Sequence, residues 1–231
     1  MKLARAVKIY KPEILECPKC NSKLEYVYTV SNKVVQFSSG KAFRIKNRGY
    51  KCPLCNDNHV YISQTGNKLA FKGYTYSTKL LCSIEKYKSE GKSRDEICDM
   101  FISKGIEISD RNIDMIYKKV KIYLDRDYDT YIQEEYNKML QEYNEIRLSI
   151  DLISIDDIYY MLFYNFFSNE LIKIFKVDSY ENNEVVELLS KYINDKYNIT
   201  HIVTIRPMFK FYQILKSLAP KSTKFSSFQK F

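Results

Sequence analysis

The chain of 231 residues is 45% hydrophobic and carries 37 Lys and Arg against 28 Asp and Glu, a formal charge of +9. This length suits one or two hydrophobic cores, and no stretch approaches the roughly 18 apolar residues of a membrane span, which argues against a membrane protein. Residues 1–79 hold 15 Lys and Arg against 4 Asp and Glu. Such concentrated positive charge favours a polyanionic partner, and we expect double-stranded DNA. The alternative is a solvated, lysine-rich surface without a ligand.

Two C-P-x-C runs stand near the N-terminus, at Cys17–Cys20 and Cys52–Cys55. Each run places two thiolates on one tight turn, and two such turns joined by a β-hairpin supply the four soft ligands that tetrahedral zinc prefers. The alternative is a pair of disulfides. The first residues are charged and lack the apolar run of a signal peptide, so we expect a reducing, cytoplasmic compartment that disfavours disulfides. The sequence therefore predicts a structural Zn²⁺ held by Cys17, Cys20, Cys52 and Cys55 in a zinc ribbon over residues 1–77.

Between the cysteine pairs the sequence predicts a hairpin. Leu24–Phe37 alternates as strands do, a Ser-Ser-Gly turn follows, and a second strand begins at Ala42. Arg44, Lys46 and Arg48 share one face because strand side chains repeat every two residues. They are either DNA phosphate contacts or solvated charge on an edge strand. His59–Ser63 is expected to form a further strand, with His59 outside the metal site.

Residues 78–124 carry the pattern of three short helices. Thr78–Glu90 has apolar residues at helix spacing, Ser93 and Glu96 form a capping box for the second helix, and Ser109 caps the third. Cys82 and Cys98 fall on the apolar faces, where a free cysteine is usually a small buried hydrophobe. The three helices predict a helix-turn-helix domain.

The third predicted helix is the expected DNA-reading element. Its N-terminal end would enter the major groove, where Arg and Asn recognise guanine and adenine, so Arg111 and Asn112 are the candidate base contacts. The other candidate DNA contacts on this helix are the capping residue and three lysines available to phosphates, namely Ser109, Lys118, Lys119 and Lys121.

Beyond this domain, Asp125–Arg147 predicts one uninterrupted connecting helix, with pairing against a partner helix as an alternative. Residues 148–231 then change character and predict the order β-β-β-α-β-α-β, which is typical of a ribonuclease-H-like domain. The predicted fold class is α+β and multidomain: zinc ribbon (1–77), tri-helical helix-turn-helix (78–124), connecting helix (125–147) and an α/β ribonuclease-H-like domain (148–231).

With these elements in order, the chain resembles a transposase of the Asp-Asp-Glu family. The string G-x-S-x-x-E-I that begins at Gly91 is similar to those families' DNA-binding helices, and Ile150-Asp151 resembles the position of their first catalytic Asp. The segment THIVTIRPM corresponds to a strand that usually ends in Val-Ser-Asp, and SSFQKF to a segment that usually ends in Cys-x-Phe-His.

The resemblance implies a two-metal phosphoryl-transfer site, and the departures from it imply that the site is lost. Asp151 would be one metal ligand. Ile205 stands where the second Asp is expected, Arg206 would oppose a cation, and no helix with the third acid follows before Phe231. The nearby acids Asp156 and Asp157 are interpreted as a turn between strands. No catalytic residue is therefore assigned, with Asp151 as a remnant.

The sequence thus predicts a non-catalytic, transposase-derived DNA-binding protein, nucleoid-associated in the cytoplasm, with a role as a transcriptional regulator or a chromatin-associated factor. No small-molecule substrate is expected, and homodimerisation stays open. Two alternatives belong to other classes. One is an active transposase or nuclease, alone or completed by a partner, which depends on Asp151. The other is an adaptor whose zinc ribbon docks onto a transcription complex.

Overall fold

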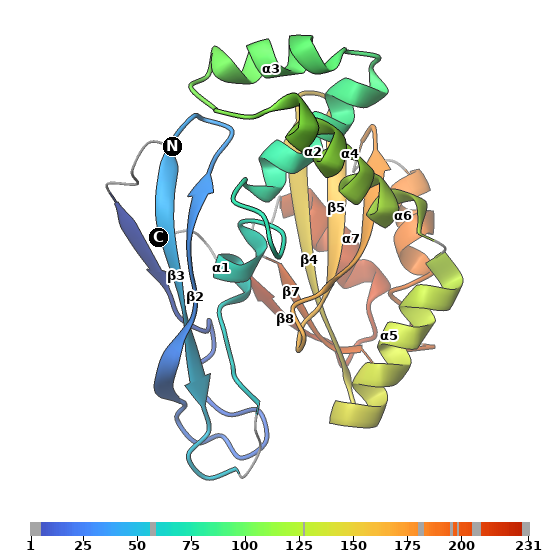
Figure 1. Ribbon diagram of the computed structural model, residues 1–231. Helices are drawn as coiled ribbons and strands as arrows, with labels where there is room; N and C mark the ends of the chain where they lie inside the picture. The colour runs from blue at the N-terminus through green and yellow to red at the C-terminus, as the bar shows by residue number, and fades with distance from the viewer. Residues whose placement is uncertain are drawn as a thin grey trace. The chain divides into compact units, whose positions relative to one another are not determined.

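A computed structural model describes residues 6–55, 59–126, 128–179, 183–194, 196–197, 199–204 and 209–227. The chain divides into two units, Met1–Lys118 and Lys119–Phe231. The described residues form seven helices and two sheets, a mixed α/β composition (Figure 1). None of the helices in these ranges is long and apolar enough to cross a membrane.

The first unit contains a three-stranded sheet in the order β1-β3-β2. Strand β3 (Ala42–Lys51) is central, parallel to β1 (Val7–Tyr10) and antiparallel to β2 (Glu25–Gln36). The predicted hairpin is therefore present: β2 lies within the predicted segment Leu24–Phe37, and the strand predicted to begin at Ala42 continues to Lys51. One face of the sheet packs through Val35 and Ile45 against Leu69 and Ala70.

The predicted strand at His59–Ser63 is wrong. Only Tyr61 pairs with the sheet, through an isolated bridge to Tyr50, and the short helix α1 (Gln64–Lys68) follows. The carboxylate of Glu13 accepts hydrogen bonds from the Ser63 hydroxyl at 2.6 Å and from two backbone amides of the first turn at 2.9 Å. These bonds satisfy amides that a helix start leaves free, so a distant Glu initiates the helix.

Three helices follow, the third of which crosses the boundary between the two units, and their positions match the sequence prediction closely. They are α2 (Thr78–Ser89), α3 (Arg94–Ile102) and α4 (Asp110–Asp125). The capping box is present: the Glu96 amide donates to the Ser93 hydroxyl and the Ser93 amide donates to Glu96 at 2.7 Å. The bonds from Ser93 lower the pKa of Glu96. Cys82 and Cys98 are buried, as predicted.

The tip of the β2–β3 hairpin contacts the loop between α3 and α4. The Gln36 side-chain amide donates to the Gly105 carbonyl at 3.1 Å. Gly40 has a φ of +76°, and a Cβ at this position would lie 2.0 Å from the carbonyl oxygen of Lys104. Only glycine permits both this backbone conformation and this close approach. The hairpin and the helices therefore belong to one unit.

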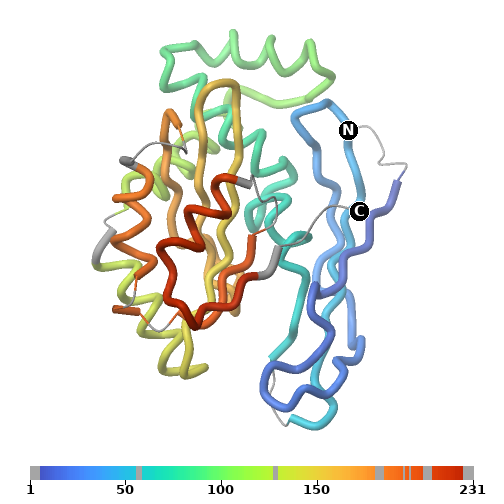
Figure 2. The backbone as a smooth tube through the Cα atoms, turned by 180° about the vertical axis from the view of Figure 1, so that it is seen from behind, coloured from blue at the N-terminus to red at the C-terminus, as the bar shows by residue number. Residues whose placement is uncertain are grey.

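The second unit is built on a five-stranded sheet in the order β6-β5-β4-β7-β8. Strands β4 (Ile146–Ile155), β5 (Ile158–Asn165) and β6 (Leu171–Val177) are antiparallel neighbours. Strand β7 (Ile199–Thr204) runs parallel to β4, and β8 (Lys224–Ser227) runs parallel to β7. With α6 (Asn183–Ser190) and α7 (Phe209–Leu218), the order along the chain is the predicted β-β-β-α-β-α-β. Figure 2 shows α7 in front of the strands.

The predicted connecting helix over Asp125–Arg147 is confirmed as a helix, but its bounds are wrong. Helix α4 ends at Asp125, a separate helix α5 (Tyr128–Tyr143) follows, and β4 already begins at Ile146. The apolar stripe of α5 packs on the five-stranded sheet through Ile132, Tyr136 and Met139 rather than on a partner helix. The Tyr136 hydroxyl donates to the Tyr192 carbonyl at 3.0 Å, and burial raises the pKa of Tyr136.

Contacts from β6 explain why α4 ends where it does. The Lys173 ammonium donates to the carbonyls of Leu124 and Arg126, and the Arg126 guanidinium donates to the Ile172 carbonyl at 3.0 Å. A cation at the C-terminus of a helix satisfies free carbonyls and the helix dipole. The end of α4 is therefore determined by a residue almost fifty positions away.

A glycine substitution tests the contact at the hairpin tip. Gly40→Ala should lower the free energy of unfolding by about 2 kcal/mol more than Gly73→Ala, because both positions have a positive φ but only Gly40 faces a backbone oxygen. Chemical denaturation of the two variants measures the difference. Equal destabilisation would show that the hairpin tip does not pack on the α3–α4 loop.

Candidate functional site

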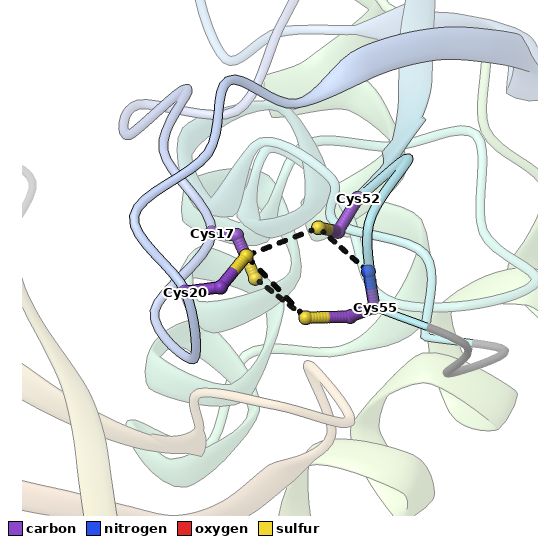
Figure 3. A group of neighbouring side chains, drawn as sticks. All are labelled: Cys17, Cys20, Cys52 and Cys55. Atoms are coloured by element: carbon purple, nitrogen blue, oxygen red, sulfur yellow. Dashed lines mark hydrogen bonds between the residues drawn. The ribbon is translucent and has the colours of Figure 1, made fainter.

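The sulfur atoms of Cys17, Cys20, Cys52 and Cys55 lie within 4.8 Å of one another (Figure 3). The separations are 3.7 Å for Cys17–Cys55, 3.5 Å for Cys20–Cys52 and 3.4 Å for Cys20–Cys55. A tetrahedral tetrathiolate site with bonds of about 2.3 Å has sulfur–sulfur edges of about 3.8 Å. A disulfide is about 2.05 Å long, and all four cysteines are free. The arrangement therefore fits a bound metal ion and not two disulfides.

Local structure positions the first cysteine pair. The Cys17 amide donates to the Ser22 carbonyl and the Asn21 amide donates to the Cys17 carbonyl, both at 2.8 Å. Asn21 has a φ of +58°, and Asn is one of the few non-glycine residues that adopt this conformation readily. An Asn also follows the second pair, although Asn56 lies outside the described residues. An Asn directly after each cysteine pair is therefore a second sequence signal for these turns, in addition to the spacing of the cysteines.

The hairpin brings the second pair to the first. Strand β2 starts shortly after Cys20 and β3 ends at Lys51, where Glu25 pairs with Lys51 and Tyr26 with Tyr50. Both turns consequently lie at the open end of the hairpin. Cys17 and Cys52 are buried beside Leu24 and Tyr50, whereas Cys20 is exposed.

Ser22 is a further residue of the site that sequence reasoning missed. Its hydroxyl lies 3.0 Å from both the Cys20 and the Cys52 sulfur. The hydrogen bond from Ser22 is the main cause that lowers the pKa of Cys52 to about 6, and it lowers the pKa of Cys20 as well. Hydrogen bonding with Cys20 raises the pKa of Cys55. Thiolates are the form that binds metal, so Ser22 favours the ligand state of two cysteines.

The predicted phosphate contacts lie on β3. Arg44, Lys46 and Arg48 alternate with the buried Ile45 and Asn47, so the three cations share one face. This strand is the centre of its sheet, which removes the interpretation of the three residues as edge-strand charge. Arg44 donates to Asn32 at 3.4 Å, and the Arg48 guanidinium lies 5.2 Å from the Tyr26 ring centre.

The predicted reading residues on α4 divide into two groups. Arg111 and Lys118 are exposed and line a depression of about 610 Å³ together with Arg94, Asp110, Asp114 and Met115. Asn112 is only partly exposed, and its side chain forms a hydrogen bond with the Tyr76 hydroxyl. Burial raises the pKa of Tyr76, and the hydrogen bond with Asn112 acts in the opposite direction. The exposed stripe is therefore Arg111, Met115 and Lys118, at helical spacing.

The remaining α4 residues have local partners. The Ser109 carbonyl accepts from the Ile113 amide at 3.1 Å, Lys119 lies 5.2 Å from the Tyr123 ring centre, and Lys121 forms a 3.9 Å ion pair with Asp125. Asp114 forms ion pairs with Arg94 at 3.3 Å and with Lys88 at 3.7 Å. These two pairs connect α4 to α3 and α2.

In the second unit, Asp151 lies on β4, is 9% exposed and accepts a hydrogen bond from the Leu152 amide at 3.0 Å. The described pairing of β4 with β7 ends at Ile150 and Thr204, and the predictions for Ile205, Arg206 and the end of SSFQKF lie outside the described residues. Asp156 and Asp157 form the β4–β5 turn, as predicted, with a φ of +52° at Asp156. Among the described residues, the four cysteines form the only group of three or more side chains placed to share a metal ion.

A search against protein-family models found no match, and a search of curated protein sequences found none either.

Substitution of the cysteines tests the metal centre. We expect one metal ion per chain, and Cys52→Ser should reduce the metal content to near zero because a ligand is lost. Ser22→Ala should weaken metal affinity by roughly 10–100-fold, as loss of a hydrogen bond to a ligand does. Elemental analysis and competition with a chelator measure the two effects. Cys82→Ala and Cys98→Ala are the matched controls, since both remove a buried thiol outside the cluster; a loss of metal in these controls equal to that in Cys52→Ser would contradict the assignment.

Proposed function

We propose that this protein is a non-catalytic, transposase-derived protein that binds double-stranded DNA and contains a structural Zn²⁺. Zinc is the ion that the donor set favours, because four soft thiolates in tetrahedral arrangement suit zinc and leave no open position for a substrate. Cys17, Cys20, Cys52 and Cys55 would hold it in a zinc ribbon. A role in stabilising the fold follows from the closed ligand set.

The observation that carries the DNA-binding proposal is the exposed stripe at the start of α4. Arg111 and Lys118 are exposed there, and Arg94 from α3 lies beside them. A helix-turn-helix protein presents the N-terminal part of its reading helix to the major groove. Arg111 would read guanine, and Met115 would contact a thymine methyl group, because apolar side chains recognise that group. Asn112 contributes less, since Tyr76 engages its side chain.

The sheet of the first unit would supply the electrostatic share of binding. Arg44, Lys46 and Arg48 are partly exposed, and none forms an ion pair with a carboxylate of the described residues. Cations without carboxylate partners are available to phosphates, and neutralising phosphates releases counterions. These cations would thus contact backbone phosphates, which are the same in every DNA sequence.

The topology of the second unit supports the transposase-derived part of the proposal. Three antiparallel strands followed by two strands parallel to the first, with helices between them, fit a ribonuclease-H-like domain. Asp151 lies on β4, where the family has its first acid. Because Ile205 stands where the family has its second acid, the domain would serve as a scaffold or dimerisation surface in a regulatory or chromatin-associated protein.

Two sets of variants separate the contributions of the sheet and the helix. The triple variant Arg44→Gln, Lys46→Gln, Arg48→Gln should weaken binding to all duplexes and reduce the slope of log affinity against log salt by about 2–3, because about 0.9 counterions are released per phosphate contact. Arg111→Ala should instead relax sequence preference by about 1–3 kcal/mol at one base pair, with a smaller effect for Asn112→Ala. Selection from random duplexes at stated salt concentrations, followed by anisotropy titrations, measures both quantities.

The control for the triple variant is a second triple variant, Lys72→Gln, Lys79→Gln, Lys191→Gln, which removes the same charge from exposed positions elsewhere. Equal salt slopes in the two triple variants would remove the sheet from the DNA-binding surface. Failure of the unaltered protein to bind any duplex at low salt would contradict the proposed function itself.

A further inference from the structure

Arg44, Lys46 and Arg48 lie on a face of the three-stranded sheet that is partly exposed in the described part of the first unit. Val35 and Ile45 on the opposite face pack against Leu69 and Ala70. On the basic face, the register aligns Val7 with Arg44 and Ile9 with Lys46 on the β1 side. On the β2 side it aligns Thr29 with Arg48 and Asn32 with Lys46. The basic row therefore runs along the middle of this face.

Exposed apolar and aromatic side chains flank the basic row. Val7 is 52% exposed, Ile9 is 50% exposed and Tyr26 is 51% exposed. The Tyr26 ring lies 5.2 Å from the Arg48 guanidinium and makes an edge contact with the Tyr50 ring at 5.9 Å. These neighbours restrain the Tyr26 ring and still leave about half of the side chain accessible.

This combination distinguishes two forms of nucleic acid. The backbone of a duplex offers phosphates and sugars to a surface and keeps its bases stacked inside, so it gives an exposed tyrosine and two aliphatic side chains nothing apolar to contact. A single strand offers phosphates and unpaired base faces together. Proteins that bind single strands combine a basic groove with aromatic side chains on which bases stack, and sheets are a recurrent platform for this.

The spacing of the basic row also suits an extended chain of phosphates. Successive side chains on one face of a strand are separated by two residues, or about 6.6–6.8 Å. Arg44, Lys46 and Arg48 thus form a row of three evenly spaced cations on one strand. An extended polynucleotide lying along β3 would pass its phosphates over this row and place its bases over Tyr26 on one side or Val7 and Ile9 on the other.

From the exposed face, its cations without carboxylate partners among the described residues and the flanking apolar side chains, we propose that the β1-β3-β2 face binds single-stranded nucleic acid, with Tyr26 as a base-stacking residue. The inference rests on the proposed nucleic-acid-binding function of the same basic row and adds the form of ligand that this row takes. The bases of duplex DNA would then be read by α4 while the basic row contacts duplex phosphates, and the same row together with Tyr26 would hold an unpaired strand.

The chain offers a matched control for Tyr26. Tyr28 lies two residues away on the same strand and is 47% exposed. A register shift lies between Tyr26, which pairs with Tyr50, and Tyr28, which pairs with Gly49. Because Gly49 and Tyr50 are neighbours on β3 and face opposite sides of the sheet, the rings of Tyr26 and Tyr28 also lie on opposite faces. Substitution of either tyrosine removes an exposed ring from β2, but only Tyr26 belongs to the proposed stacking surface.

The test uses the full, metal-loaded chain and two fluorescent probes of the same sequence, a single-stranded oligonucleotide and its duplex. Tyr26→Ala should weaken binding of the single strand by about tenfold or more, because one stacked base contributes on that scale. Tyr26→Phe, which retains the ring, and Tyr28→Ala should each stay within about twofold of the unaltered protein. None of the three should change duplex affinity by more than about twofold.

Metal content establishes that each variant is folded. If Tyr26→Ala loses its metal, Ile9→Gln, at an exposed position on β1 opposite Lys46, takes its place and should weaken single-strand binding several-fold without changing duplex binding. Equal losses for Tyr26→Ala and Tyr28→Ala, or equal losses for the two probes, would overturn the inference. If the unaltered protein binds the duplex but not the single strand, this inference alone is overturned. If it binds neither probe, the proposed function is overturned as well.

Discussion

The convergence of four thiolates at the open end of the β2–β3 hairpin is the constraint on which the first unit depends. Among the described residues, Leu24 and Tyr50 are the other buried apolar side chains packed there, and their burial contributes roughly 3–6 kcal/mol together. Ordering the backbone of the two C-P-x-C turns alone costs roughly 8–16 kcal/mol. Apolar burial is therefore too small to hold the turns together. A structural zinc ion contributes about 10–16 kcal/mol in small peptides, which is the scale that the turns require.

The hairpin connects the cysteine turns to the other parts of the unit. One end of the hairpin holds the cysteines, and the other end, at Gln36 and Gly40, meets the loop that precedes α4. The twelve residues of β2 span about 36–40 Å. The basic row on β3 lies between the two ends. The candidate metal centre, the proposed nucleic-acid surface of the sheet and the start of the proposed reading helix are consequently parts of one continuous structure.

Much of this arrangement is local and could be predicted from the sequence. The cysteine spacing predicted the cluster of four cysteines, Ser93 and Glu96 predicted the start of α3, and the strand-and-helix order of the second unit followed from alternation and helix periodicity. The errors arose where a distant residue determines local structure. Glu13 initiates α1 where a strand was expected, and Lys173 with Arg126 separates α4 from α5. The role of Ser22 depends on the folding of both turns, and the engagement of Asn112 depends on Tyr76. The hydrophobic periodicity of a sequence does not indicate such contacts between residues that are distant along the chain.

The central claim is that the metal centre supports a nucleic-acid-binding unit. The most direct measurement is the affinity of the full chain for a labelled duplex, determined by fluorescence anisotropy at one salt concentration. The affinity is compared before metal removal, after complete removal by a chelator, and after addition of zinc. The account predicts that affinity falls at least tenfold when the metal is removed and returns when zinc is added, because the open end of the hairpin that carries Arg44, Lys46 and Arg48 is then no longer held together. Undiminished affinity of the metal-free chain would contradict it.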